Sequence, residues 1–183
     1  MITLVPFTSA DIPTLVSWIP DATMLLQWAG PTLDWPLTAE QLERNLKSSG
    51  PGTSHLIYRV NNLAGEHAGH IEIKSIDPVH SNAMIGKVLI APAFRGQGLA
   101  LPLMNAVLKI CFDDLKLHRV GLRVFAQNTG AISTYKRAGF VAEGLDREVR
   151  RTPDGTWWNA CTMGILEHEW LDQKRRAALQ PDT

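Results

Sequence analysis

A glycine-rich stretch that follows an apolar segment is the part of this 183-residue sequence best suited to chemistry. Val88, Leu89 and Ile90 precede Ala91-Pro92, and Arg95-Gly96-Gln97-Gly98-Leu99-Ala100 then leads into apolar residues at helical spacing. The first turn of a helix carries unpaired N–H groups and the positive end of the helix dipole, and glycine lets a ligand approach the backbone closely. The stretch therefore predicts a loop that holds a phosphate group.

Two familiar phosphate loops do not fit this stretch. The dinucleotide fingerprint needs a third glycine and a βαβ unit, but Leu101 stands at the third position and the preceding segments suggest a meander. The nucleotide P-loop ends in Gly-Lys-Ser/Thr, whereas this loop ends in Gly98-Leu99-Ala100. Neither a dinucleotide nor a nucleoside triphosphate is therefore expected.

A second motif stands at 128–140, where the sequence reads Asn-Thr-Gly-Ala-Ile-Ser-Thr-Tyr-Lys-Arg-Ala-Gly-Phe. With the glycine loop, it resembles the GNAT superfamily of N-acetyltransferases, which pairs Arg/Gln-x-x-Gly-x-Gly/Ala with N-x-x-A-x-x-x-Y-x-x-x-G-F. The ending at 163–170 and the Trp-rich loop near the N-terminus resemble the RimJ/RimL branch, which acetylates N-termini of ribosomal proteins. The resemblance to the superfamily covers nearly the whole chain.

The resemblance implies that acetyl-CoA is the acetyl donor and that a primary amine attacks it directly in a ternary complex. Tyr135 would protonate the departing thiolate, and the amide of Leu89 or Ile90 would polarise the thioester carbonyl. Asn128 would contact the coenzyme near its pantetheine arm. The implied coenzyme-binding residues are Val88, Leu89, Ile90, Arg95, Gly96, Gln97, Gly98, Leu99, Ala100, Asn128 and Ala131.

The general base is less evident from the sequence. Some N-terminal acetyltransferases of the superfamily carry a glutamate five residues before the Asn, but Arg123 occupies that position here. Glu72, in an alternating apolar segment, is the substitute that we expect, acting through water. An α-amine with a pKa near ~8 costs only about 1.4 kcal/mol to deprotonate at pH 7, against about 4.6 for a lysine-like amine. A weak base therefore favours an acceptor of low pKa.

The acceptor is predicted to be an amine-bearing small molecule or a protein N-terminus. Trp28 and Trp35 lie near chain breakers and are the aromatic residues that we expect to line its groove. The arginines at 147, 150 and 151 suit an acidic acceptor or the 3′-phosphate of the coenzyme, but the pattern favours a solvated hairpin. A CoA sensor or docking module without turnover is the alternative function, and transfer of a larger acyl group is a third.

The elements that must position these residues follow from periodicity and breakers. Strands are expected at 2–7, 55–60, 67–76, 83–90, 119–126, 140–149 and 157–166, and helices at 8–19, 38–48, 99–115 and 131–137. Residues 28–31 and 35–36 are expected in a loop. This order predicts a single α+β domain with a mixed, mostly antiparallel sheet of about seven strands and about four helices. We place the domain at 1–170 and a charged tail, which we expect to be a surface helix, at 171–183.

Composition excludes several classes of protein. With 45% hydrophobic and 20% charged residues, the chain can build its own core, and 18 basic against 18 acidic residues give no field that would attract nucleic acid or a membrane. Two cysteines in apolar runs and an N-terminus without a signal-like segment suggest the cytoplasm. No metal site is expected, because His67 and His70 would face opposite sides of a strand. An exposed last strand would allow a homodimer.

Overall fold

The computed structural model describes residues 2–179, and its centre is one seven-stranded sheet in the order β1-β2-β3-β4-β5-β7-β6. Only β4 and β5 pair in parallel, and every other neighbouring pair is antiparallel. The strands are β1 (Thr3–Pro6), β2 (Leu56–Asn61), β3 (His67–Asp77), β4 (Asn82–Ile90), β5 (Arg119–Phe125), β6 (Val141–Arg151) and β7 (Trp157–Leu166). The mixed, mostly antiparallel α+β sheet predicted from the sequence is confirmed.

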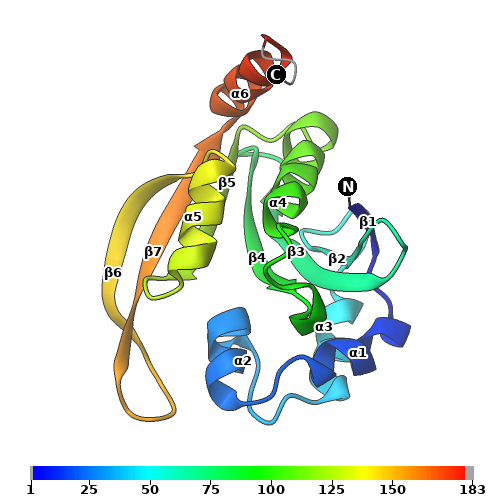
Figure 1. Cartoon of the computed structure of the whole chain (residues 1–183), viewed down its shortest axis with the longest axis vertical. Helices are drawn as coiled ribbons and strands as arrows, with labels where there is room; N and C mark the ends of the chain where they lie inside the picture. The colour runs from blue at the N-terminus through cyan, green and yellow to red at the C-terminus, as the bar shows by residue number, and fades with distance from the viewer. Residues whose placement is uncertain (1, 180–183) are drawn as a thin grey trace.

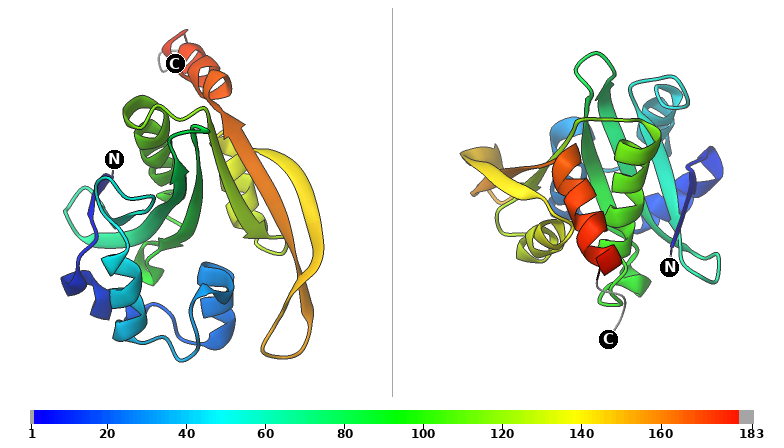
Figure 2. Two further views of the ribbon diagram at one scale, coloured as in Figure 1. Left: turned by 180° about the vertical axis from the view of Figure 1, so that it is seen from behind. Right: turned by 90° about the horizontal axis from the view of Figure 1, so that it is seen from above.

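Helices cover both faces of the sheet and bury two separate cores (Figures 1 and 2). On one face α4 and α5 pack against the middle strands through residues such as Leu103, Met104 and Tyr135, and on the other α1–α3 pack through Leu15, Leu25 and Leu42. The helices are α1 (Ile12–Ser17), α2 (Ala22–Ala29), α3 (Ala39–Lys47), α4 (Ala100–Lys109), α5 (Thr129–Arg137) and α6 (Glu167–Leu179).

The sheet opens at its parallel pair. β4 and β5 are in register only from Asn82–Arg119 to Ile85–Leu122, after which no pairing joins them. The two strands diverge below this point in Figure 1, and α2 lies near the open end. Because a separated pair leaves backbone N–H and C=O groups without a strand partner, this split can receive a ligand at a sheet edge in the middle of the molecule.

A β-bulge in β4 lies beside the split. His70 pairs with Leu89 and Glu72 pairs with Gly86, so β4 carries one more residue than β3 in this interval. Lys87 has φ 47°, which is rare for a residue other than glycine. Bulges of this kind bend a strand and redirect its side chains. The bulge therefore changes which groups of β4 reach the split.

Three details differ from the sequence-based expectation. The structure describes six α-helices rather than about four. Trp28 lies in the last turn of helix α2 and not in a loop. Asp21 caps this helix by accepting a hydrogen bond from the Met24 N–H at 2.7 Å. The long helix expected at 99–115 is α4 followed by a π-helical turn at Ile110–Asp114. The expected boundary at 170/171 lies within α6 and stays a prediction; Trp170 of this helix stacks on Phe112.

Candidate active site

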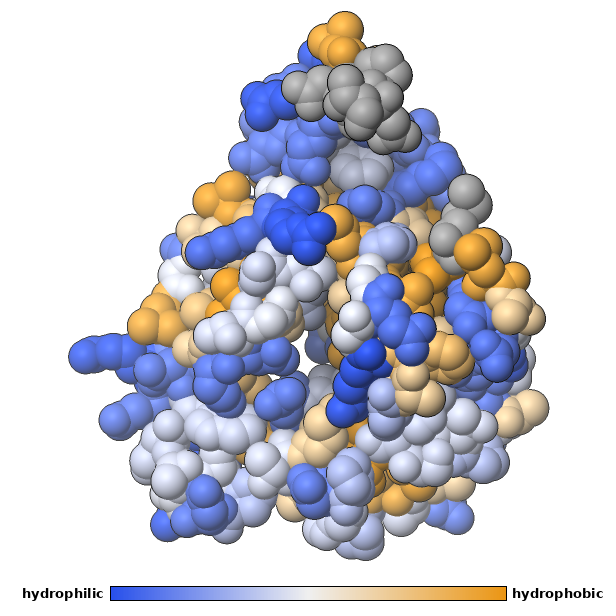
Figure 3. Space-filling view, in the orientation of Figure 1, coloured by the Kyte–Doolittle hydropathy of each residue, from blue (hydrophilic) through white to orange (hydrophobic). Residues whose placement is uncertain are grey.

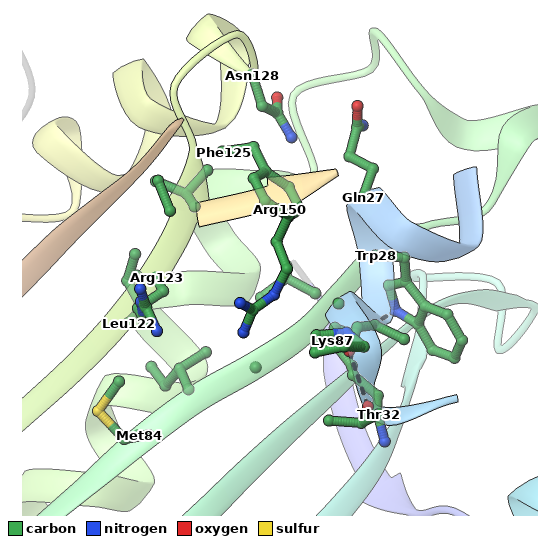
Figure 4. Close-up of a pocket in the computed structure, with 18 of the residues that line it drawn as sticks. Gln27, Trp28, Thr32, Met84, Lys87, Leu122, Arg123, Phe125, Asn128 and Arg150 are labelled. Carbon is green, nitrogen blue, oxygen red and sulfur yellow. Dashed lines mark hydrogen bonds between the residues drawn. The ribbon is translucent and has the colours of Figure 1, made fainter. Parts of the chain in front are cut away.

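A cavity of about 280 Å³ fills the split between β4 and β5. Its walls come from α2 and the turn after it, from β3, β4 and β5, from the start of α5 and from the β6–β7 hairpin. Figure 3 shows the molecule hollowed in the middle of one face, with mostly hydrophilic and neutral residues around the opening. Figure 4 shows side chains of several of these elements turned toward the same space. The cavity therefore joins segments that lie far apart in sequence, from Gln27 on α2 to Ala160 on β7.

The glycine loop has the backbone that a phosphate cradle needs. Gly96 and Gly98 have φ values of 74° and 76°, in the left-handed region, and a Cβ added at either position would meet nothing within 4 Å. The Arg95 guanidinium donates to the Ile90 carbonyl at 3.2 Å, and the Gln97 amide donates to the Ala93 carbonyl at 2.9 Å. Both side chains hold the loop itself, residues 96–98 are exposed, and no side chain of residues 2–179 caps the beginning of α4.

Tyr135 and Asn128 bring the second motif to the cavity, and both line it. The Asn128 carboxamide caps α5 by accepting a hydrogen bond from the Ala131 N–H at 3.2 Å. This cap gives Ala131 a structural role, because Ala131 itself does not line the cavity. Burial raises the pKa of the Tyr135 phenol to about 12, so this group is protonated at neutral pH.

The two tryptophans expected in the acceptor groove have different surroundings. Trp28 is buried and lines the cavity, and its indole N–H donates to the carbonyl of Lys87 at 2.8 Å. This hydrogen bond ties α2 to the β4 bulge. Trp35 is 48% exposed and lines a separate surface depression beside Arg151 and Pro153. The structure thus brings Trp28, but not Trp35, to the cavity.

Glu72 lies outside the cavity lining, in a buried network on β3. Its carboxylate accepts hydrogen bonds from Lys87 Nζ at 3.0 Å and Asn45 Nδ2 at 2.8 Å, and the Nε2 atoms of His55 and His70 lie at 3.0 and 3.4 Å. Burial alone would raise the pKa of Glu72, but the two histidines and the Lys87 charge outweigh it and hold this pKa well below its ordinary value. So weak a base is better suited to anchoring the bulge than to accepting a proton.

Basic side chains dominate the polar lining of the cavity. Lys74, Lys87, Arg123 and Arg150 all contribute to it, and no Asp or Glu of residues 2–179 does. Lys87 is paired with Glu72, and Arg123 is paired with Asp146. Arg150 donates only to the neighbouring Val149 carbonyl at 2.7 Å. The site therefore combines a protonated phenol, a split sheet and an excess of positive charge.

This arrangement can be compared with known proteins. A family model described as an acetyltransferase (GNAT) domain matches residues 1–141. The chain belongs to the GNAT acetyltransferase family. The match covers the glycine loop and the second motif, so the superfamily resemblance seen in the sequence is confirmed, whereas the RimJ/RimL branch stays a prediction.

Individual GNAT relatives cover less of the chain. A spermidine N(1)-acetyltransferase of Escherichia coli (strain K12) is 33% identical over 112 residues, 61% of this chain and 59% of that protein. The matched segment thus spans less than two thirds of that relative's length. An L-amino acid N-acetyltransferase of the same strain is 26% identical over 118 residues, 64% of this chain and 71% of that protein.

Solved structures confirm the GNAT fold over almost the full length. The spermidine N-acetyltransferase of Vibrio cholerae, solved in complex with CoA and spermine, superposes with a TM-score of 0.82 at 24% identity, covering 93% of this chain and 98% of that chain. At this level of identity the likeness concerns the fold. Within residues 2–179 no helix is long and apolar enough to cross a membrane, and no cluster of three potential metal ligands is found.

Sequence reasoning missed part of the GNAT cavity. Lys74 and Phe125 belong to no motif, and Arg123 is marked in the sequence only as the replacement of an expected glutamate. Arg150 belongs to the arginine cluster at 147, 150 and 151, for which the sequence allows more than one interpretation. No sequence signal singles it out, because its place depends on a bulge in β6 between Asp146 and Arg150, where Glu148 has φ 50°. Such a bulge changes the face on which the following side chains lie.

Proposed function

We propose that this protein transfers the acetyl group of acetyl-CoA to a primary amine of a small molecule, in a ternary complex. The observation that carries the proposal is the end of the β4–β5 pairing at Ile85–Leu122, where a cavity opens with Tyr135 in its wall. GNAT family membership and the names of the spermidine and amino acid acetyltransferases support a small amine as acceptor. A protein N-terminus is the second candidate, on the RimJ/RimL resemblance.

The donor would bind along the split strand and the glycine loop. The free edge of β4 beyond Ile85 offers backbone groups to an extended pantetheine arm, as a strand would pair with a sheet edge. The exposed amides around Gly96 and Gly98 would hold the pyrophosphate at the beginning of α4. The thioester then lies in the cavity, between the two halves of the sheet.

The acceptor amine must be neutral when it attacks the thioester carbon. No carboxylate of the described chain lines the cavity to remove its proton directly. Lys74 and Arg150, which have no ion-pair partner in the described chain, supply positive charge instead, and nearby cations lower the pKa of an ammonium group by disfavouring its charged form. The acceptor would therefore lose its proton to solvent on entering the site, and the base role expected for Glu72 is not required.

Collapse of the tetrahedral intermediate breaks the C–S bond and releases the CoA thiolate. The Tyr135 phenol, with a pKa of about 12, is a weaker acid than a thiol with a pKa near ~8.5. Tyr135 therefore stabilises the thiolate by donating a hydrogen bond, and the thiolate takes up its proton from solvent afterwards. A hydrogen-bond donor that stabilises developing negative charge contributes roughly 10²- to 10³-fold in enzymes.

The test is thiol release from acetyl-CoA, measured with Tyr135→Phe beside the wild type. The amine pools are polyamines, amino acids, aminoglycosides and peptide N-termini. We expect turnover with at least one pool, a loss of at least about 100-fold in kcat for Tyr135→Phe, and an unchanged Kd for CoA by calorimetry. CoA binding without turnover in any pool would instead favour the sensor function, and turnover unaffected by Tyr135→Phe would remove this residue from the mechanism.

A further inference from the structure

The charge of the cavity carries an inference about the acceptor, which rests on the function proposed above. We propose that the acceptor is a small amine bearing a carboxylate, such as an amino acid, and that Arg150 and Lys74 bind this carboxylate. A polyamine would bring two or more positive charges into a cavity whose lining holds four cations, two of them without an acidic partner, and, among residues 2–179, no acidic side chain. An anionic group on the acceptor removes this repulsion.

Arg150 is the principal ligand in this proposal. It is partly buried in the cavity wall, and its one hydrogen bond in the described structure goes to the adjacent Val149 carbonyl. Figure 4 shows its guanidinium directed into the space between Arg123 on β5 and Trp28 on α2. A guanidinium has five N–H donors in a planar fork that matches a carboxylate, so most of its binding capacity is available to a ligand.

Lys74 supplies a second positive charge from β3. Its side chain lies across Gly86 of β4, since a Cβ added at Gly86 would be 2.8 Å from Lys74 Cε and 3.0 Å from Nζ. The absence of a side chain at Gly86 therefore makes room for the ammonium group in the cavity wall. The Glu72 carboxylate, which is already bound to Lys87, forms no ion pair with Lys74. A ligand carboxylate would give Lys74 a direct partner.

The remaining two cations are already compensated. Lys87 is bound to Glu72 at 3.0 Å and Arg123 is paired with Asp146. Lys87 and Arg123 therefore have acidic partners. Lys74 and Arg150 face the cavity without an acidic partner in the described chain. This difference also explains why a chain with no net charge can have a cationic site. The two uncompensated charges, on β3 and β6, would hold the carboxylate while the amine faces the thioester.

The experiment compares matched pairs of acceptors in the thiol-release assay, each an α-amino acid and its carboxamide, with spermidine as a third arm. The pair differs by one negative charge. The amine of the carboxamide is less basic than that of the acid, so a larger fraction of the carboxamide is in the reactive neutral form. A higher kcat/KM for the acid must therefore come from the site. We expect kcat/KM to be at least about tenfold higher for the acid, the effect of one charge-assisted hydrogen bond.

Variants then assign the preference to residues. Arg150→Gln should reduce the ratio of acid to carboxamide by roughly 10- to 100-fold, Arg150→Lys should retain part of it, and Lys74→Gln should reduce it independently. Arg147→Gln is the matched control, because Arg147 is exposed on the same strand and outside the cavity lining. The Kd for CoA should stay unchanged in all four, which separates this site from one for the coenzyme phosphates.

Several results would overturn the inference. They are a ratio near one in the wild type, spermidine used more efficiently than every acid, or a ratio that neither Arg150→Gln nor Lys74→Gln alters. If no amine releases thiol, the proposed transfer fails, but calorimetry of the same pairs with the CoA-loaded protein still decides the inference. Tighter binding of the acid that is lost in Arg150→Gln would support the carboxylate site, and equal binding of acid and carboxamide would refute it.

Discussion

Replacing Glu72 by Gln separates a structural role from a chemical one. The wild-type carboxylate is 1% exposed and bound by Lys87, Asn45 and two histidines. Glutamine keeps the shape of the side chain but removes its charge, which leaves the ammonium of Lys87 buried without a counter-ion. Breaking a buried ion pair in this way costs about 3–5 kcal/mol. For a chain of this size, that corresponds to a fall in Tm of roughly 6–20 °C.

Thermal and urea unfolding measure the loss of stability in Glu72→Gln. A double-mutant cycle with Lys87 shows whether the loss comes from the buried ion pair. Glu72→Gln combined with Lys87→Met removes both charges and should recover much of the stability lost in the single variant. Glu143→Gln is the control, because Glu143 forms an ion pair with Arg119 on the surface, where such pairs contribute about 0–1 kcal/mol. A large loss confined to Glu72→Gln would locate the effect in the buried network.

The same carboxylate predicts how stability depends on pH. Its folded-state pKa lies well below the ordinary value of 4.5, so the folded protein binds a proton at Glu72 less readily than the unfolded chain does. The stability from this shift is complete above pH 4.5 and is lost as the pH falls through the folded-state pKa. The stability difference between wild type and Glu72→Gln should therefore shrink with acidification below pH 4.5.

Activity measurements could refute this reasoning. Near neutral pH and well below its Tm, Glu72→Gln should keep much of its kcat, because the carboxylate does not line the cavity. A variant with an unchanged Tm and a kcat lowered by 100-fold or more would show that Glu72 takes part in proton transfer after all. In that case the structural role assigned to it would be wrong.

Three further changes test other parts of the site. Trp28→Phe leaves the buried Lys87 carbonyl without its indole donor and should cost about 1–3 kcal/mol in urea unfolding; an unchanged stability would show that this bond contributes little. Gly98→Val forces a β-branched residue to φ 76° and should weaken CoA binding about tenfold or more by calorimetry, whereas Gly130→Ala in α5 should not. Burial raises the pKa of Cys111 to about 12, so a thiol reagent at pH 8 should modify Cys161 first and Cys111 only on unfolding.

The sequence predicted the strands and the glycine loop because each of these depends on local pattern. Alternation along β4 and the breakers around it mark a strand wherever it lies, and glycines at 96 and 98 are needed for positive φ whatever surrounds them. The sequence did not predict the helix α2, because its local pattern resembles that of a loop. Its Asp21 cap follows Pro20, and the breakers Gly30-Pro31 end the helix, so that the breaker pattern predicts a loop at 28–31 where the last turn of α2 lies.

The bulge at Lys87 could not be read from the sequence. Nothing local marks this position, because a lysine has no preference for φ 47° and the apolar alternation continues on both sides. The conformation is held by distant groups, namely Glu72 on the neighbouring strand and Trp28 on α2. Strain at a single residue persists only where its surroundings stabilise it. Such contacts link segments that no motif connects, so only the folded structure shows them.

The donor site and the acceptor site also differ in how far the sequence predicts them. The donor side is built from backbone groups, whose positions depend on glycine, proline and strand pattern, and these leave a motif in the sequence. The acceptor side proposed above consists of side chains of α2, β3, β5 and β6 that line the cavity, each of which is ambiguous by itself. The Arg150 of an exposed hairpin lines the cavity beside a second bulge, at Glu148, and beside the split of β4 from β5. Specificity for the acceptor can therefore change by substitution at these few positions while the motifs of the donor site stay intact.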